Sequence, residues 1–423
     1  MLTARKAISI GEAIEKIMRD VCAGDAERVA LMEASGRFLA QDIRANQEVP
    51  AFDRSLYDGF AIKAKDTINA NQKNPVLIEI VGHIGAGAVF QGKVSDNQSV
   101  RIMTGAEMPK CCDAVIMLEH VKELMVDGKS YISIDKQIAE NEKVFKKGAE
   151  ISEGVLLVKK GERISPGIIG LLATFGYSEV LVGAKPKVGV LATGSELLDV
   201  EEPLAPGKIR NSNSYMLMAQ IEQLGATPVF LGKLEDDLEQ SFNAVVQALE
   251  KVDVLITTGG VSVGDFDYLP EIYERLGAQV LFNKLAMRPG SVTTVAKVKH
   301  QFLFGLSGNP SASYIGFELF VRPVLRTLLG NKQPYLNTQK AILTENFLVP
   351  NNFTQLIRAK VRVEGTDIFA SSNGLNMSNS ITSLVGADSL VVLPPSKGGY
   401  EKGSLVDILL LSEKGQSECF FLT

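Results

Sequence analysis

Hydrophobic and polar residues follow different rhythms in different parts of this chain, and the changes of rhythm predict several domains. Between residues 75 and 135, short β-type runs are separated by Gly, Asp and Asn, which indicates a small, mostly β domain. From Lys187 to Leu329, apolar strand-like runs alternate with helical patterns, which is typical of parallel strands joined by right-handed crossovers. After a polar linker at residues 331–339, short strands with Pro and Gly turns predict a separate β module.

The fold class predicted from this pattern is multidomain α/β and β. We expect residues 1–48 and 146–185 to form one discontinuous α+β domain, because neither segment looks large enough to fold alone. Residues 49–145 are expected to form the small, mostly β domain and residues 186–330 a central α/β domain with a mostly parallel sheet. Residues 331–423 are expected to form a C-terminal β-barrel-like domain.

Caps and periodicity predict individual elements. Ser9 with Glu12 three residues later is a capping-box pattern at the start of an amphipathic helix. Helices are expected at Ser212–Leu224, Leu238–Glu250 and Ser311–Leu329. The β-branched run at Val254–Ile256 predicts a buried strand, and Gln279–Phe282, Ser291–Ala296 and Phe302–Leu306 are further strands of the same domain.

Composition narrows the class of protein. With 423 residues, 45% of them hydrophobic and 22% charged, the chain resembles an ordinary soluble globular protein. A net charge of −5 argues against broad binding to nucleic acid or anionic membranes, because phosphate backbones demand a basic face. None of the four cysteines forms a CxxC pair, so we expect reduced thiols. The absence of a signal-peptide core or membrane-length apolar run makes the cytoplasm the expected location.

Three loops of the α/β region carry the candidate chemistry: TGSEL, TTGGVSVGDFD and LSGNPSA. Ligands of open sheets bind at the carboxyl ends of strands, where these loops are expected. Gly259 and Gly260 leave backbone N–H groups open to an anion, and Asp265 and Asp267 suit a hard cation beside it. The alternative is that the glycines form only a turn and Asp267 only caps a helix.

Acidic and cationic residues gather around the same predicted sheet edge. The acidic set is Glu196, the pair Asp236 and Asp237, Asp265 and Asp267. The possible anion-binding set is Lys284, Arg288, Ser307, Gly308 and Asn309. Such a combination suits a phosphorylated, metal-bridged ligand, although a solvated rim could contain the same residue types.

The small β domain offers two further polar stretches. Residues 49–62 crowd polar groups, Ser55 and Asp58 among them, between apolar ends, which is typical of a functional loop. Asp58-Gly59 could equally form a hairpin turn. Thr104 and Gly105 follow a strand, and the lysines at 143, 146 and 147 indicate a solvated face.

Seven motifs in one order resemble the molybdopterin molybdenumtransferase family, whose eukaryotic relatives include the gephyrin C-terminal region. They are PAFDRSLYDGFA (50–61), RIMTGAEMP (101–109), ATGSEL (192–197), GKIRNSN (207–213), TTGGVSVGDFDY (257–268), KLAMRPG (284–290) and GLSGNPSAS (305–313). The resemblance implies a transferase that inserts molybdenum from molybdate into adenylylated molybdopterin and releases AMP, with Mg²⁺ or another divalent cation. It also implies a molybdopterin-binding-like α/β domain, a homodimer with a shared active site, and the upstream molybdopterin adenylyltransferase as a further partner.

The resemblance also implies roles for individual residues. The expected catalytic residues are Asp58, Thr104, Glu196, Asp236, Asp267 and Lys284, with Glu196 and Asp267 as metal ligands. The expected substrate-binding residues are Ser55, Thr193, Gly194, Ser195, Gly259, Gly260, Ser262, Asp265, Arg288, Pro289, Ser307, Gly308, Asn309, Arg358 and Ser378.

The chain departs from the family pattern at three places. Arg288 stands where many relatives have lysine, and Ser307 replaces a proline. Phe145, followed by Gly148-Ala149-Glu150, stands where the family commonly has an arginine and Gly-Glu-Asp, so an anion contact is missing there. A tungstate-preferring or weakly active paralogue, and a scaffolding protein of the gephyrin type, are the alternative functions.

Overall fold

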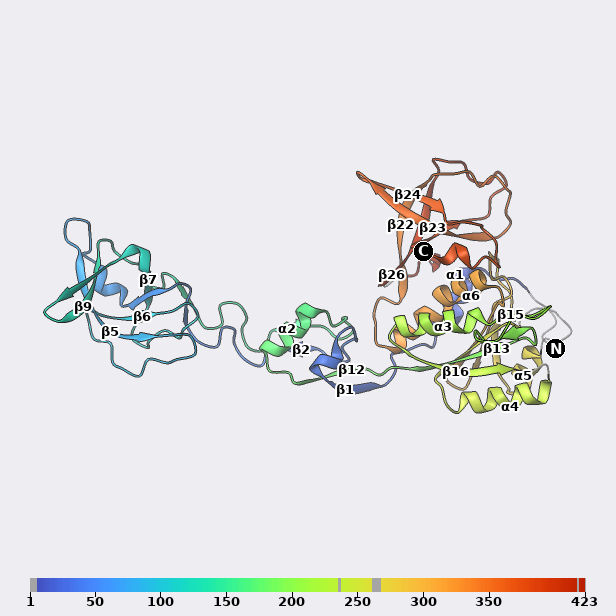
Figure 1. The fold of residues 1–423 in the computed structure, drawn as a ribbon, viewed down its shortest axis with the longest axis horizontal. Helices are drawn as coiled ribbons and strands as arrows, with labels where there is room; N and C mark the ends of the chain where they lie inside the picture. The colour runs from blue at the N-terminus through green and yellow to red at the C-terminus, as the bar shows by residue number, and fades with distance from the viewer. Residues whose placement is uncertain (1–5, 235–236, 261–267, 417, 423) are drawn as a thin grey trace. The chain divides into compact units, whose positions relative to one another are not determined.

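The computed structural model describes residues 6–234, 237–260, 268–416 and 418–422, traced in Figure 1. The chain divides into two units. The first combines Met1–Gln41, Lys160–Ala173 and Tyr177–Thr423, and the second combines Asp42–Lys159 and Thr174–Gly176. The described strands form three six-stranded and four two-stranded sheets. A multidomain fold with mixed sheets and a β-rich C-terminal part is therefore confirmed.

The second unit is built on a six-stranded sheet in the order β7-β4-β6-β5-β9-β8. Its strands are β4 (Gly59–Ile62), β5 (Val76–Ile84), β6 (Gln98–Ile102), β7 (Ala114–Met117), β8 (Lys122–Val126) and β9 (Lys129–Ile134). Successive side chains of a strand point to opposite faces. Phe60 and Ile62 therefore pack in one core cluster, and Ala61 packs in another with Val100. Asp58 immediately precedes β4 and Thr104 follows its neighbour β6, so the sheet brings the two loops together.

Short elements complete this unit. They are β2 (Ile43–Arg44) with β11 (Leu156–Val158), β3 (Arg54–Ser55) with β10 (Val144–Phe145), η2 (Ala64–Thr67) and η3 (Leu118–His120).

The larger unit contains a six-stranded α/β sheet in the order β16-β13-β17-β21-β20-β18. Its strands are β13 (Lys187–Thr193), β16 (Thr227–Leu234), β17 (Val254–Thr258), β18 (Gln279–Phe282), β20 (Thr294–Val298) and β21 (Gln301–Leu306). The first four strands in this order are parallel, so β13, β17 and β21 end at the same edge. Alternate residues of β17 enter different cores: Val254 and Ile256 pack on one face and Leu255 on the other.

Two strands of this sheet, β18 and β20, are not part of its parallel arrangement. β20 pairs antiparallel with both β18 and β21. Only Lys299 and His300 separate β20 from β21, and Lys299 adopts a positive φ of 54°. Two residues can close a hairpin but cannot form the crossover that parallel strands need.

Helices cover both faces of this sheet. α3 (Ser212–Gln223) packs on one face through Leu217 and Ile221, and α4 (Leu238–Leu249) and α5 (Leu269–Arg275) pack on the other. The helix expected at Ser311–Leu329 is interrupted: α6 (Pro310–Gly316) and α7 (Arg322–Leu328) flank a π-helical turn, η4 (Phe317–Val321). Pro323 has no N–H to donate to the carbonyl four residues earlier, so a regular α-helix cannot continue through it.

The C-terminal sheet has the order β19-β23-β24-β22-β26-β25, and β25 also pairs with β23. Its strands are β19 (Met287–Arg288), β22 (Tyr335–Leu343), β23 (Thr354–Glu364), β24 (Asp367–Ser372), β25 (Ser389–Leu393) and β26 (Leu405–Gln416). β19 comes from the α/β part of the chain and places Arg288 beside Gln355. The linker expected at 331–339 is shorter than predicted, because β22 already begins at Tyr335.

The remaining elements are α1 (Ile10–Met18), β1 (Ala26–Ala30) with β12 (Glu179–Gly183), η1 (Leu31–Ala34), α2 (Pro166–Thr174), β14 (Leu197–Leu198) with β15 (Ile209–Arg210), η5 (Thr382–Leu384) and η6 (Phe420–Leu422). The predicted cap of α1 is confirmed, because the Ser9 hydroxyl accepts from the Glu12 amide at 3.1 Å. No helix within the described ranges is both long and apolar enough to cross a bilayer.

Candidate active site

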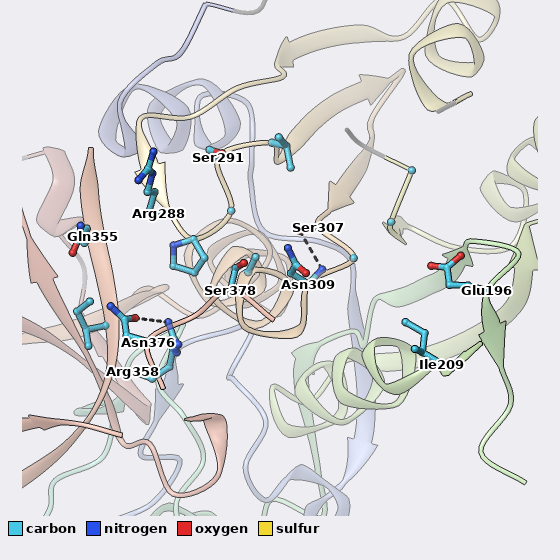
Figure 2. A pocket seen from close by; sticks show the side chains of 18 residues that line it. Glu196, Ile209, Arg288, Ser291, Ser307, Asn309, Gln355, Arg358, Asn376 and Ser378 are labelled. Carbon is cyan, nitrogen blue, oxygen red and sulfur yellow. Dashed lines mark hydrogen bonds between the residues drawn. The ribbon is translucent and has the colours of Figure 1, made fainter. Parts of the chain in front are cut away.

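The loops that follow β13, β17 and β21 line two adjoining hollows at the carboxyl edge of the α/β sheet. The first, shown in Figure 2, has a volume of about 830 Å³, and the second about 670 Å³. Glycines and polar residues of all three loops form the wall that the hollows share: Glu196, Gly259, Gly260, Gly308 and Asn309. The sequence-based placement of the three loops at one edge is thus confirmed.

Glycine is required where these loops approach one another. Gly259 has a φ of 89°, and a Cβ on it would lie 2.6 Å from the carbonyl oxygen of Thr193. Its amide donates to Leu306 at 3.0 Å, while the Thr193 hydroxyl donates to the Thr258 carbonyl at 3.1 Å. Gly194 has a φ of 135°, and the carboxylate of Glu196 occupies the space that a Cβ there would need.

Cationic side chains from two elements stand at one end of the first hollow. Arg288 on β19 is exposed, with its guanidinium 5.4 Å from the ring centroid of Phe353. Arg358 on β23 is only 2% exposed and donates to neutral oxygens of Ser383, Asn376, Leu375 and Met377 at 3.0–3.1 Å. Burial lowers the pKa of Arg358, yet a guanidinium stays protonated in proteins.

This end of the hollow carries a net positive charge. No carboxylate within the described ranges forms a salt bridge with Arg288 or Arg358. Ser291, Gln355, Asn376 and Ser378 add neutral donors and acceptors around the two arginines. Arginine, serine and amide donors are the groups that a tetrahedral oxyanion requires.

Glu196 stands at the other end, beside Ile209 and away from the arginines (Figure 2). The hollow is therefore electrically polarised, with a hard anionic oxygen at one end and guanidinium groups at the other. A carboxylate of this kind can supply one of the oxygen ligands of a Mg²⁺ ion. No set of three or more His, Cys, Asp or Glu side chains that could hold a metal occurs in the part of the chain that the structure describes.

The other predicted residues of the α/β part fall into three groups. Thr193, Gly194 and Ser195 line the second hollow, and Pro289 and Ser307 line the first. Lys284 is half-buried and lines neither of them, and its carbonyl accepts from Ile8 at 3.2 Å. The remaining four, Asp236, Ser262, Asp265 and Asp267, lie outside the described residues, while Asp237 caps α4 by accepting from Gln240 at 2.7 Å.

Several residues that line the hollows were not predicted from the sequence: Ile209, Asn213, Ser291, Gln355, Asn376 and Asn379. Ile209 and Asn213 belong to the run GKIRNSN, which offered a local signal. Gln355 had no such signal, because the pairing of β19 with β23 brings it to Arg288.

Asp58 and Thr104 in the second unit form one hydrogen-bonded group. The Asp58 carboxylate accepts from the Thr104 backbone amide at 2.6 Å and from its hydroxyl at 2.8 Å. These two bonds, the backbone bond above all, hold the pKa of Asp58 below its ordinary value. Ser55 is buried and links the same loops, accepting from Gly105 at 2.9 Å and donating to Ala106 at 3.1 Å through its backbone. Gly59 begins β4, so the hairpin-turn alternative for Asp58-Gly59 is excluded.

The segment around Phe145 is occupied by internal contacts of the second unit. The Arg54 guanidinium lies 5.1 Å from the Phe145 ring centroid, which is a cation–π distance. Lys146 pairs with Asp53 at 2.8 Å, and Lys147 pairs with Glu48 at 3.0 Å. The two lysines are therefore engaged by carboxylates of the same unit.

Comparison with known proteins covers nearly the whole chain. Residues 8–176 match the family model "MoeA N-terminal region (domain I and II)", residues 189–327 match "Probable molybdopterin binding domain", and residues 340–411 match "MoeA C-terminal region (domain IV)". A molybdopterin molybdenumtransferase of Bacillus subtilis is 51% identical over 99% of this chain and 97% of its own. One of Staphylococcus epidermidis is 44% identical over 98% of each chain.

Solved structures agree with these matches. Two structures of a molybdopterin biosynthesis MoeA protein from Pyrococcus horikoshii superpose with TM-scores of 0.85 and 0.78, at 32% and 30% identity. They cover 97% and 96% of this chain and 100% of their own. The chain therefore belongs to the molybdopterin molybdenumtransferase family.

Proposed function

We propose that this protein inserts molybdenum from molybdate into adenylylated molybdopterin and releases AMP, in the biosynthesis of the molybdenum cofactor. The observation that carries the proposal is the polarised hollow, with Arg288 and Arg358 at one end and Glu196 at the other. Molybdate is a tetrahedral dianion, so it binds at the arginine end, where Ser378 and Asn376 supply further polar groups. The phosphates of the nucleotide bind along the glycine-rich shared wall, where Gly259, Gly260 and Gly308 carry no Cβ to block close approach.

Cleavage of the phosphoanhydride bond requires the charge on its oxygens to be neutralised. Mg²⁺, held by Glu196 together with Asp267, would supply that neutralisation. Glu196 fits such a role because its carboxylate is exposed at the rim of both hollows. Asp236 and Lys284 remain predictions as catalytic residues, and Ser262 and Asp265 as substrate-binding residues.

The reaction can be tested directly. Purified protein is incubated with adenylylated molybdopterin, Mg²⁺ and molybdate, and AMP is quantified. We expect AMP release that depends on molybdate, and its absence would refute the proposal. Replacing molybdate by tungstate in the same assay tests the tungstate-preferring alternative. The Arg54–Phe145 contact motivates this alternative, because an aromatic ring stands where relatives offer an anion contact.

We further propose a homodimer in which Asp58 and Thr104 of one copy serve the hollow of the other. The exposure of Thr104 and the ionised state of Asp58 support a role at a shared site. Mixing the inactive variants Asp58→Ala and Glu196→Ala should restore about a quarter of wild-type activity, because half of randomly assorted dimers contain one intact site. If the mixture stays as inactive as either variant alone, the shared site is wrong.

The four-domain division at residues 48, 145, 185 and 330 is supported by the three family models, whose descriptions refer to domains I, II and IV. The upstream molybdopterin adenylyltransferase is a proposed partner, because the adenylylated substrate must come from such an enzyme. A gephyrin-type scaffolding role without turnover would instead give a stoichiometric protein partner and no AMP release.

A further inference from the structure

Asn213, the second residue of α3, links two of the loops that form the site. Its side chain is 8% exposed and contributes to the wall of the second hollow. The amide nitrogen Nδ2 donates to the Thr258 hydroxyl at 2.9 Å and to the Gly308 carbonyl at 2.8 Å. Its two acceptors belong to different segments, because Thr258 is the last residue of β17 and Gly308 lies in the loop after β21.

The hydrogen bonds of Asn213 are the centre of a wider network. The Thr258 hydroxyl lies 3.4 Å from the Ser307 carbonyl, to which it donates, and the Thr193 hydroxyl donates to the Thr258 carbonyl at 3.1 Å. All three strand-end loops are thus connected through Thr258 and Asn213. The helix that carries the Asn213 amide is itself held in place. Leu217 and Ile221 pack α3 into the core, and the Asn211 side chain caps the first turn by accepting from the Ser214 amide at 3.2 Å.

The bond to Gly308 fixes the orientation of a peptide group in the shared wall. In a trans peptide the carbonyl and the following N–H point in opposite directions. The Gly308 oxygen is directed at Asn213, and the Asn309 amide on the other side donates to the Ser307 hydroxyl at 3.2 Å. A rotated peptide would instead present the negative end of the Gly308 carbonyl to the hollow, where an anion would be repelled.

We propose that Asn213 is a positioning residue of this site. It keeps the Gly308 carbonyl turned toward α3, and it fixes the Thr258–Gly259 segment, so that the shared wall does not present the Gly308 carbonyl oxygen to an anionic substrate. This inference rests on the proposed function, since it names what prepares the same wall for phosphate.

The test compares wild type with Asn213→Leu and Asn213→Ala. Leucine has nearly the shape of asparagine but neither donor, so it separates hydrogen bonding from packing. We expect both variants to raise the dissociation constant for AMP, measured calorimetrically with Mg²⁺, and the KM for adenylylated molybdopterin by about tenfold, which corresponds to one lost hydrogen bond and its freed carbonyl. The kcat should fall less than the KM rises.

Gln220→Leu is the matched control. Gln220 lies two turns further along α3, is buried, donates to Glu318 at 2.9 Å, and lines neither hollow among the described residues. It should cost stability without changing AMP affinity. Thr258→Val supplies a second route, because its effect on AMP affinity should be non-additive with that of Asn213→Leu if both act through one hydrogen bond.

The outcomes separate the two proposals. If wild type releases no AMP in the presence of molybdate, the proposed function fails. If wild type is active while Asn213→Leu and Asn213→Ala bind AMP within twofold of it, the positioning role is overturned. Equal losses of AMP affinity in Gln220→Leu, or full additivity with Thr258→Val, would overturn it as well, because either result reduces Asn213 to a structural residue.

Discussion

Replacing the buried arginine of the site, Arg358→Met, should weaken molybdate binding strongly while the protein still folds. Methionine keeps an unbranched stem but removes a guanidinium that donates four hydrogen bonds at 3.0–3.1 Å. At about 0.5–1.5 kcal/mol for a typical hydrogen bond, the four together stabilise the fold by roughly 2–6 kcal/mol. Removing a desolvated charge offsets part of that, so we expect the free energy of unfolding to fall by about 1–3 kcal/mol.

Arg358→Met should also weaken the binding of molybdate, and much more than the control variant Arg362→Met does. A hydrogen bond or close contact to a charged group contributes about 1.5–3 kcal/mol, so molybdate affinity should fall roughly 10- to 150-fold. Asn376, which Arg358 holds at 3.0 Å, also loses its position beside the hollow. Arg358→Lys keeps the charge but not the planar fork, and we expect an intermediate loss.

Arg362→Met is the matched control, because Arg362 lies on the same strand. Its side chain is 66% exposed and pairs with Glu364 at 2.5 Å. An exposed pair contributes at most about 1 kcal/mol, and no change in molybdate affinity is expected. Calorimetric titration with molybdate and urea unfolding measure both quantities. A folded Arg358→Met protein that binds molybdate as tightly as wild type would show that Arg358 does not contribute to the anion site.

Three other substitutions test further parts of the structure. Glu318→Gln breaks the buried ion pair with Arg322 at 2.9 Å and should lower the free energy of unfolding by about 3–5 kcal/mol. Glu12→Gln, whose pair with Lys16 is exposed, should lower it by about 0.5 kcal/mol or less. Equal urea midpoints for the two variants would contradict this. Thr104→Val should raise the pKa of Asp58 part of the way toward its ordinary value, because the backbone bond from residue 104 remains. As acid is added, the variant should therefore lose the stabilisation by the ionised Asp58 at a higher pH than wild type. An unchanged carbon-13 titration of Asp58 would argue against the contact. Gly259→Ala should lower the melting temperature and AMP release more than Gly277→Ala does. Both glycines have a positive φ, but only at Gly259 would an added Cβ lie 2.6 Å from a backbone atom. Similar losses in the two variants would show that φ alone matters.

Features set by local geometry could be predicted from the sequence. The Ser9–Glu12 cap depends on neighbours within one turn, and the buried strand β17 is apparent from its β-branched run. The meeting of the TGSEL, TTGG and LSGNP loops follows from strand polarity, since parallel strands end at one edge. Asp58 and Thr104 came from the resemblance, and the neighbouring strands β4 and β6 supply the physical reason that they touch.

Features that depend on distant parts of the chain could not be predicted. The hairpin between β20 and β21 closes through Lys299 at positive φ, without the Asn-Gly or Gly signal that normally marks such a turn. Gln355 reaches the hollow only because β19 leaves the α/β part and pairs with β23. Asn213 looks like an ordinary residue of a helix start, and its two acceptors lie far along the chain. The roles of Asp236, Ser262, Asp265 and Asp267 remain predictions, because these residues lie outside the described ranges.

The most direct test of the central claim locates the oxyanion itself. Crystals of the protein grown with molybdate are measured at the molybdenum absorption edge, so that the anomalous signal identifies the metal. We predict the main peak at the arginine end of the first hollow, within hydrogen-bond distance of Arg288, Arg358 or Ser378. A main peak elsewhere, with that end of the hollow free of molybdenum at saturating molybdate, would contradict it.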